Sequence, residues 1–369
     1  MQANTNKLVS TYIDSVYGSE IVAAAICGSY AIGVANKHSD IDVVVIVKAD
    51  STLMTRVGEF EVAQFHGKRI EILFCSAGTI SATIAYADQR NYASLNDGEK
   101  RDLERLVCAK PVIGEKTWRA AIAGVRLDVY QRQLSLDYRR VAAANFEDLI
   151  GVLSVREYVI AVDFVRFLLQ TDLEALSSIT GDTYGRRKWL LKRLKMNAFI
   201  NTSIVAQYED IYYATNVRQQ NKNVTEWLGY AVRVWQDVQA NVNAKLFGLQ
   251  CLDARTVAWL RSSHNGFYAT VPDLLLFRLT DGWAVRTSKR TVSIDEKSAV
   301  ILSSLSRSAS YGEDRTDHQI ETFSCHHDLD VFTDKSLMKA LVDADLLMEY
   351  RDEDFYRNSI FHRFGSKVK

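Results

Sequence analysis

Short apolar runs alternate with polar turns over the first 115 residues or so. Ile21–Cys27 and Ile41–Lys48 have the length of buried strands, and Arg69–Cys75 predicts a third strand in which Glu71 stands between two isoleucines. Before them, Leu8, Tyr12, Ile13 and Val16 recur at helical spacing within residues 5–18. Residues 79–107 return to a helical pattern, and residues 107–114, which carry Pro111, read as a linker. This stretch predicts a small α+β domain.

The pattern becomes helical throughout from Thr117 to about His264, and this region contains no proline. Val152, Val155, Val159, Val162 and Leu168 illustrate the apolar stripe. We expect a helical bundle. Its helices are predicted near residues 117–145, 147–171, 186–215, 219–247 and 252–262.

Short strands return after Gly266. Leu274–Leu279, Trp283–Thr287 and Thr291–Ile294 are separated by turn residues, and helices are predicted from Asp295 to Leu305 and from Thr333 to about Ala344. Residues 346–350 predict a last strand. Three domains are therefore expected, over residues 1–116, 117–264 and 265–369.

Composition excludes several classes of protein. The 369 residues include 45 Lys plus Arg and 45 Asp plus Glu, so the formal net charge of zero argues against non-specific coating of nucleic acid. Five cysteines without CxxC spacing indicate reduced thiols and a cytoplasmic protein. We expect no signal peptide and no membrane span, because apolar runs stop at strand length.

The densest candidate chemistry lies between Gly28 and Val47. Gly28-Ser29 follows the first predicted strand, and Asp40 and Asp42 flank Ile41 at the start of the second. On a strand the two aspartates point to the same face, where their like charges favour a cation between them. Glu71 is an acid alone among apolar residues on the next predicted strand, which is costly unless it is paired or bound to metal. The pattern predicts a divalent-metal site beside a small-residue turn that can approach phosphate.

This order of residues resembles the DNA polymerase β-like nucleotidyltransferase superfamily: a Gly-Ser turn, an acid-x-acid pair about ten residues later, and a third acid on a neighbouring strand. The resemblance covers about residues 8–115. It implies that Asp40, Asp42 and Glu71 are catalytic and hold Mg²⁺, with two ions expected, and that Gly28 and Ser29 contact the triphosphate of an NTP. A transferase domain followed by a helical bundle is similar to the antibiotic nucleotidyltransferases.

The predicted fold class is therefore α+β: a nucleotidyltransferase-type mixed sheet with helices, then a helical bundle, then a small winged-helix-like module. The last module weakly resembles peptide-binding winged-helix domains, through Pro272–Arg278, Asp281–Val285 and the helix of residues 294–305. That resemblance implies a leader peptide as a possible partner, added as a strand to a sheet edge.

The acceptor side carries weaker patterns. Six positive charges fall within Arg186–Lys195, which is either a solvated basic helix face or a phosphate contact. Lys188, next to Trp189, is our candidate for nucleotide binding. Glu147 and Asp148, expected at the start of a bundle helix, are the first candidates for a general base, although helix N-terminal charges commonly only complement the helix dipole.

We expect a Mg²⁺-dependent nucleotidyltransferase that moves an NMP group from an NTP, with ATP preferred, to a small molecule or a peptide and releases pyrophosphate. Two alternatives stay open. One is a toxin-like nucleotidyltransferase that modifies tRNA through the basic run. The other is a non-catalytic protein that senses a nucleotide and binds a peptide.

Overall fold

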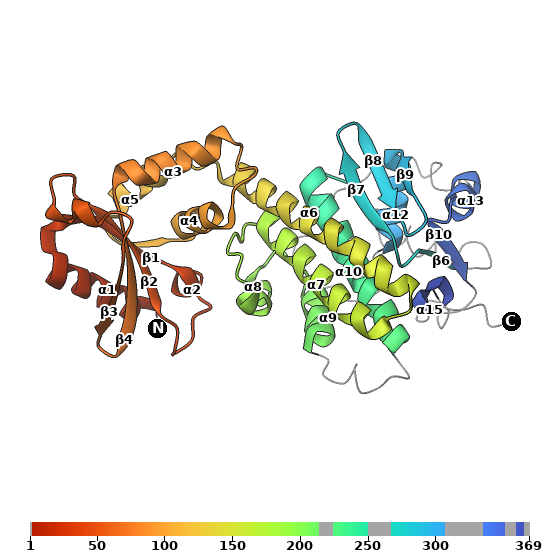
Figure 1. The fold of residues 1–369 in the computed structure, drawn as a ribbon, viewed down its shortest axis with the longest axis horizontal. Helices are drawn as coiled ribbons and strands as arrows, with labels where there is room; N and C mark the ends of the chain where they lie inside the picture. Colours follow the sequence, from red (N-terminus) through yellow and green to blue (C-terminus); the bar gives the residue numbers. More distant parts are fainter. Residues whose placement is uncertain (1, 214–223, 250–266, 307–334, 351–358, 365–369) are drawn as a thin grey trace. The chain divides into compact units, whose positions relative to one another are not determined.

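A five-stranded mixed sheet forms the centre of the N-terminal part of the chain (Figure 1). The strand order is β3-β4-β2-β1-β5, and only β2 and β4 run parallel to each other. The computed structural model describes residues 2–213, 224–249, 267–306, 335–350 and 359–364. The strands are β1 (Ile21–Cys27), β2 (Ile41–Val47), β3 (Phe60–Phe65), β4 (Lys68–Cys75) and β5 (Lys110–Ile113).

Helices cover both faces of this sheet. The helical elements of this part are α1 (Gln2–Tyr17), η1 (Gly18–Glu20), α2 (Gly28–Ala31), η2 (Thr52–Arg56), α3 (Ala77–Gln89), α4 (Asp97–Val107) and α5 (Glu115–Ile122). On one face α1 packs Val9 and Ile13 against Val43 and Ile72. On the other face α3, α4 and α5 contribute Ile80, Leu106 and Trp118 to a second cluster.

Alternation along the strands decides which side chains reach each face. Ile41, Val43 and Val45 face α1, so Asp42, Val44 and Ile46 face the opposite way. The predicted strands therefore put their apolar residues into two cores, one on each side of the sheet.

The expected linker at residues 107–114 is wrong in one respect. Lys110–Ile113 forms β5 and pairs antiparallel with β1. Pro111 cannot donate a ladder hydrogen bond, but β5 lies at the edge of the sheet, where one side of a strand needs no partner.

The chain folds into two compact units. The first contains residues 1–134 and residues 181–193, and the second contains residues 135–180 and 194–369. The segment 181–193 therefore belongs with the sheet, although it follows two long helices in the sequence. The expected three-domain division stays a prediction.

Long helices build much of the second unit. The helical elements of the rest of the chain are α6 (Leu127–Ser154), α7 (Tyr158–Ile179), η3 (Arg187–Trp189), α8 (Leu190–Met196), α9 (Thr202–Tyr213), α10 (Val224–Phe247), α12 (Glu296–Ser306), α13 (Lys335–Asp343) and α15 (Ser359–Phe364). Three predicted helices are interrupted. The helix predicted at 117–145 breaks between α5 and α6, at residues 123–126, and the helix predicted at 147–171 breaks between α6 and α7, at residues 155–157. The helix predicted at 186–215 breaks at residues 197–201. There Asn197 and Asn201 accept hydrogen bonds from the backbone N–H groups of Phe199 and Ser203, which competes with helix continuation. The helix predicted at 252–262 lies outside the described residues.

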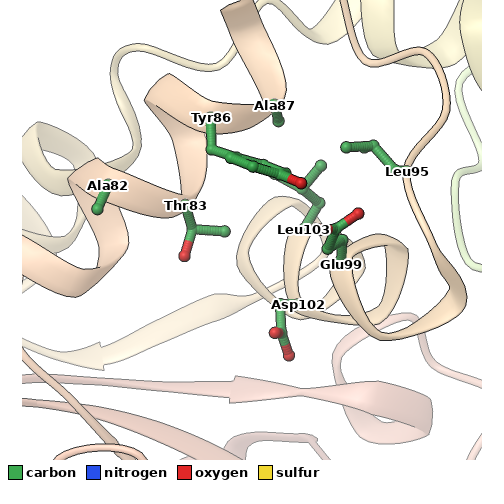
Figure 2. A pocket seen from close by; sticks show the side chains of 8 residues that line it. All are labelled: Ala82, Thr83, Tyr86, Ala87, Leu95, Glu99, Asp102 and Leu103. Atoms are coloured by element: carbon green, nitrogen blue, oxygen red, sulfur yellow. The ribbon is translucent and has the colours of Figure 1, made fainter. Parts of the chain in front are cut away.

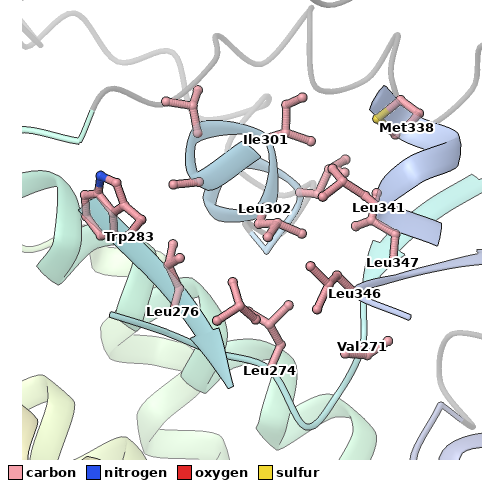
Figure 3. Close-up of a cluster of buried hydrophobic side chains, with 14 of the residues drawn as sticks. Val271, Leu274, Leu276, Trp283, Ile301, Leu302, Met338, Leu341, Leu346 and Leu347 are labelled. Atoms are coloured by element: carbon pink, nitrogen blue, oxygen red, sulfur yellow. The ribbon is translucent and has the colours of Figure 1, made fainter. Parts of the chain in front are cut away.

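Short strands and helices share a core at the C-terminal end of the second unit. The strands are β6 (Phe267–Thr270), β7 (Leu275–Leu279), β8 (Gly282–Arg286), β9 (Thr291–Ile294) and β10 (Leu347–Tyr350). β7, β8 and β9 form an antiparallel sheet, and β6 pairs with β10. Leu276, Trp283, Leu302 and Leu341 point into one apolar cluster (Figure 3). β7, β8, β9 and β10 match predicted strands, whereas β6 was not predicted. The winged-helix assignment stays a prediction.

No helix within the described ranges combines the length and the apolarity needed to cross a bilayer.

A buried charged group joins the elements of the second unit. The Asp172 carboxylate on α7 is fully buried and accepts hydrogen bonds from Arg139 on α6 and from the Trp235 indole N–H on α10, both at 2.7 Å. Arg139 also donates to the Leu276 carbonyl on β7 at 3.2 Å. Burial raises the pKa of Asp172, and the opposing effect of Arg139 is what keeps a charge tolerable there.

Replacing Asp172 with Ala should lower the free energy of unfolding by about 3–5 kcal/mol, because Arg139 would be left buried without its counter-charge. Denaturant unfolding followed by circular dichroism measures this. The control is Glu115→Ala, which removes an exposed pair with Arg119 and should cost less than about 0.5 kcal/mol. Equal losses of unfolding free energy in the two variants would contradict a stabilising role for Asp172 and its partners Arg139 and Trp235.

Candidate active site

Three predicted catalytic carboxylates share one face of the central sheet. Asp42 on β2 is the register partner of Glu71 on β4, and Asp40 immediately precedes β2. Side chains of register partners project from the same face, and so do residues two apart on one strand. Asp40, Asp42 and Glu71 therefore stand together on the face covered farther along by α3, α4 and α5.

The other neighbour of Asp42 is the turn after β1. Cys27 is its register partner on that side, and Gly28 follows with φ +64°. A Cβ atom at Gly28 would lie 2.2 Å from the Asp42 Oδ2 atom, so only glycine leaves room for this carboxylate. Ser29 is buried, and its backbone carbonyl accepts hydrogen bonds from Val34 and Ala35, which closes the turn.

Negative charge accumulates at Asp42. Burial and then the charge of Glu71 raise the pKa of the Asp42 carboxyl to about 6, with a further contribution from Asp40. Arg105 and Arg186 act in the opposite direction and lower this pKa. A carboxylate that is both desolvated and beside like charges gains most from a bound cation.

Arg69 supplies a positive charge to the site. Its guanidinium group lies 2.6 Å from the Glu71 Oε1 atom and 3.8 Å from the Asp40 Oδ2 atom. Arg69 was not among the predicted site residues, although strand alternation indicates its place: it lies two residues before Glu71 on the same strand.

The donor atoms fit a divalent cation by their chemistry. Mg²⁺ takes oxygen ligands, usually from one or two carboxylates together with substrate phosphates, and this face offers three carboxylates of which Asp42 is strongly crowded by charge. Among the side chains that the structure describes, no set of three His, Cys, Asp or Glu residues already stands at metal-ligand spacing. Arg69 contacts two of the three acids, so a metal that used them would displace this guanidinium.

Segment 181–193 brings further cations to the first unit. Arg186 forms an ion pair with Glu104 on α4, with its Nη2 atom 3.1 Å from Oε1. Glu104 is buried, and burial raises its pKa although Arg186 opposes the shift. Lys192 donates to the Val34 carbonyl in the loop after the Gly28-Ser29 turn, at 3.0 Å. The segment thus contacts both α4 and the turn.

Lys188, the predicted nucleotide-binding residue, is exposed in η3, and its Nζ atom lies 5.8 Å from the centre of the Trp189 ring. Arg186, from the same basic run, is the residue whose charge reaches Asp42. Nothing in the local sequence distinguishes Arg186 from its neighbours, and neither does it single out Arg105 on α4. Both reach the site through packing between distant segments.

The candidate general bases lie in the second unit. Glu147 and Asp148 do not start a helix as expected, because α6 runs unbroken from Leu127 to Ser154. Glu147 forms an ion pair with Arg286 on β8, at 2.6 Å. Their catalytic role stays a prediction.

Residues 9–113, which contain the three carboxylates and the Gly28-Ser29 turn, match the family of nucleotidyltransferase domains. This segment is a nucleotidyltransferase domain. The match confirms the resemblance drawn from Gly28-Ser29, Asp40, Asp42 and Glu71, the expected enzyme class and the transfer of an NMP group as the general reaction.

A solved structure described as a nucleotidyltransferase-like protein from Exiguobacterium sibiricum 255-15 is similar with a TM-score of 0.35 and 12% sequence identity. The similarity covers 66% of this chain and 79% of that protein. No curated protein matches the chain in sequence.

Replacing Gly28 with Ala should reduce nucleotidyl transfer by about 100-fold, because the new methyl group would push the Asp42 carboxylate out of place. The measurement is the rate of pyrophosphate release. Gly67→Ala is the matched control, since Gly67 also has a positive φ of +71° but nothing lies within 4 Å of the added atom. The positive φ should cost both variants about 1–2 kcal/mol of stability, and Gly28→Ala should lose more because of the added clash with Asp42. Equal activity in the two variants would contradict the steric argument.

Proposed function

We propose that this protein is a Mg²⁺-dependent nucleotidyltransferase that moves the NMP group of ATP to a hydroxyl-bearing acceptor and releases pyrophosphate. The observation that carries the proposal is the row of register partners Cys27, Asp42 and Glu71, with Asp40 next to it on the same face. A binding protein that only senses nucleotide has no need of three carboxylates crowded on one face, since their mutual repulsion destabilises the fold.

The three carboxylates and the Gly28-Ser29 turn have separate roles in this proposal. Asp40 and Asp42 hold Mg²⁺, and Glu71 completes the ligand set and accepts the proton of the acceptor hydroxyl. A bound metal would neutralise part of the phosphate charge and polarise the α-phosphate. Gly28 permits close approach of the turn, and Ser29 contacts the β- and γ-phosphates.

The bond changes in the transfer are few. The acceptor oxygen bonds to the α-phosphorus, and the bond between that phosphorus and the oxygen leading to the β-phosphate breaks. Pyrophosphate leaves with this oxygen, and the hydroxyl proton passes to Glu71. Because the attacking and leaving oxygens lie in line, the main task of the protein is to position both substrates and balance charge.

Replacing Asp42 with Asn should lower pyrophosphate release by at least about 100-fold, because a neutral amide cannot offset the metal's charge. The assay measures release from each of the four NTPs with Mg²⁺ and a panel of acceptors that includes tRNA, peptides and small alcohols. Asp14→Asn, an exposed change on α1, is the control with the same chemistry. Equal release from the two variants would contradict the proposed site. Labelling of tRNA alone would favour the tRNA-modifying alternative.

Arg186, more than Lys188, should hold the triphosphate, because its charge already acts on Asp42. Arg186→Gln should raise the Kd for Mg·ATP by about tenfold, the effect of losing one charge-assisted hydrogen bond, whereas Lys188→Gln should change it less than twofold. Equilibrium binding measures both. Arg186→Lys should recover part of the affinity. A larger increase in Kd for Lys188→Gln than for Arg186→Gln would favour Lys188 as the nucleotide-binding residue, as predicted from sequence.

A peptide acceptor or leader peptide at the C-terminal strands, and tRNA at the basic run, stay predictions. Two further charges of that run already have partners: Arg193 pairs with Asp182 and Lys195 with Glu209. This favours a small molecule over tRNA as the acceptor.

A further inference from the structure

A cavity of about 290 Å³ opens on the same face of the sheet as the carboxylates. Val44 on β2 and Leu73 on β4 form its floor, and Phe60, Thr83 and Arg105 line its sides. Val44 and Leu73 are register partners, as Asp42 and Glu71 are. Val44 lies two residues beyond Asp42 and Leu73 two residues beyond Glu71, so the floor of the cavity begins about 7 Å along the strands from these two carboxylates.

The sheet continues past Glu71 to an apolar edge. Val62 on β3 is the register partner of Glu71, and Phe60 is the partner of Leu73. Both side chains are 56% exposed and lie two residues apart, on the same face of β3. An apolar surface thus adjoins the carboxylates on the β4–β3 side only, since Cys27 and the Gly28-Ser29 turn lie on the β1 side.

The direction of transfer identifies which substrate faces that surface. If the leaving pyrophosphate lies toward the Gly28-Ser29 turn, in-line attack requires the acceptor to approach from the opposite side of Asp42. That side is Glu71 and then β3. The acceptor therefore lies over the strands that border the cavity.

The lining of the cavity is mostly apolar. The Thr83 hydroxyl already donates to the Thr79 carbonyl at 3.0 Å, which leaves its methyl group for contact. Burial raises the pKa of the Cys75 thiol to about 11, so this group is neutral. The charged edge consists of Arg105, which pairs with Asp102 at 3.0 Å and lies 5.2 Å from the centre of the Phe60 ring.

The size also limits the ligand. A volume of 290 Å³ is near the lower end for small-molecule pockets and equals that of about ten water molecules in the liquid. A neighbouring cavity of about 340 Å³ between α3 and α4 shares Thr83 and Asp102 with it. In Figure 2 Asp102 points away from Tyr86, toward the strands below, so the two cavities meet at this residue.

We propose that this cavity is the acceptor pocket, and that the acceptor is a small alcohol or phenol whose hydroxyl is carried by an apolar ring. The inference rests on the proposed function and deepens it. The ring lies between Phe60, Leu73 and Thr83, and the hydroxyl extends along the sheet toward Glu71. Polyhydroxylated sugars and polynucleotides do not suit an apolar lining, because their polar groups would be desolvated without partners.

The test uses benzyl alcohol as the probe, together with the α,β-methylene analogue of ATP. In this analogue a CH2 group replaces the oxygen between the α- and β-phosphorus atoms, which prevents transfer of the NMP group. Saturation-transfer NMR should detect benzyl alcohol bound to the full-length protein. Thr83→Phe should abolish the signal by filling the cavity. Ala85→Phe should keep it, because Ala85 is exposed on the opposite side of α3. Phe60→Ser, an exposed change that does not threaten folding, should weaken binding by about two- to tenfold.

Proximity to the carboxylates gives a second readout. With Mn²⁺ in place of Mg²⁺, the hydroxymethyl protons of bound benzyl alcohol should relax faster than its ring protons. Asp42→Asn should remove the difference. An unchanged benzyl alcohol signal in Thr83→Phe, or relaxation that does not depend on Mn²⁺, would overturn the acceptor pocket.

Binding of Mn²⁺ with the analogue, followed by electron paramagnetic resonance, separates the two levels of the proposal. Retained Mn²⁺ binding in Thr83→Phe shows that the variant is folded. If Mn²⁺ and the analogue bind but benzyl alcohol does not, the acceptor inference alone fails. If they do not bind to the wild-type protein, the proposed function fails and the acceptor pocket with it.

Discussion

The parallel pairing of β2 with β4 is the constraint on which the site depends. It sets Asp42 opposite Glu71, and the antiparallel pairing of β2 with β1 then sets Cys27 and the Gly28 turn on the other side. A slip of one residue in either pairing would turn Asp42 toward the core beneath α1, where Ile41 and Val43 now lie. The apolar residues on both faces therefore hold the register, and the register holds three like charges together despite their repulsion.

The sequence carries enough information to predict this half of the molecule. Period-two alternation places Asp40 and Asp42 on one face, and an isolated acid between isoleucines identifies Glu71. The positions of the cations are harder to predict, because they depend on packing between distant segments. Arg105 comes from α4, and Arg186 is held by its ion pair with the buried Glu104. β5 was missed because Pro111 reads as a break, and only the sheet order shows that it stands on an edge. Helix breaks at Asn197 and Asn201 similarly depend on side-chain hydrogen bonds that periodicity does not report.

The two units differ in how they treat buried charge. In the first unit, Asp42 and its neighbours remain partly open to solvent and under-compensated, which suits a site that binds charged ligands. In the second unit, Asp172 is enclosed and its Oδ2 atom accepts from both Arg139 and Trp235, so its charge connects helices away from solvent. A carboxylate with a raised pKa thus belongs to the proposed ligand site in the case of Asp42 and to a structural ion pair in the case of Asp172. The charges around each carboxylate distinguish the two cases: like charges beside Asp42, and the opposite charge of Arg139 beside Asp172.

The return of residues 181–193 to the first unit has a consequence for how this enzyme can be taken apart. The family match ends at residue 113, yet Glu104 inside it is neutralised by Arg186, and the Val34 carbonyl is met by Lys192. A fragment that ends at residue 113 would therefore lack two contacts that its own residues make in the full chain. A recombinant protein with a different helical region would keep these contacts only if that region supplied an equivalent of segment 181–193, so we expect the two regions to be inherited together.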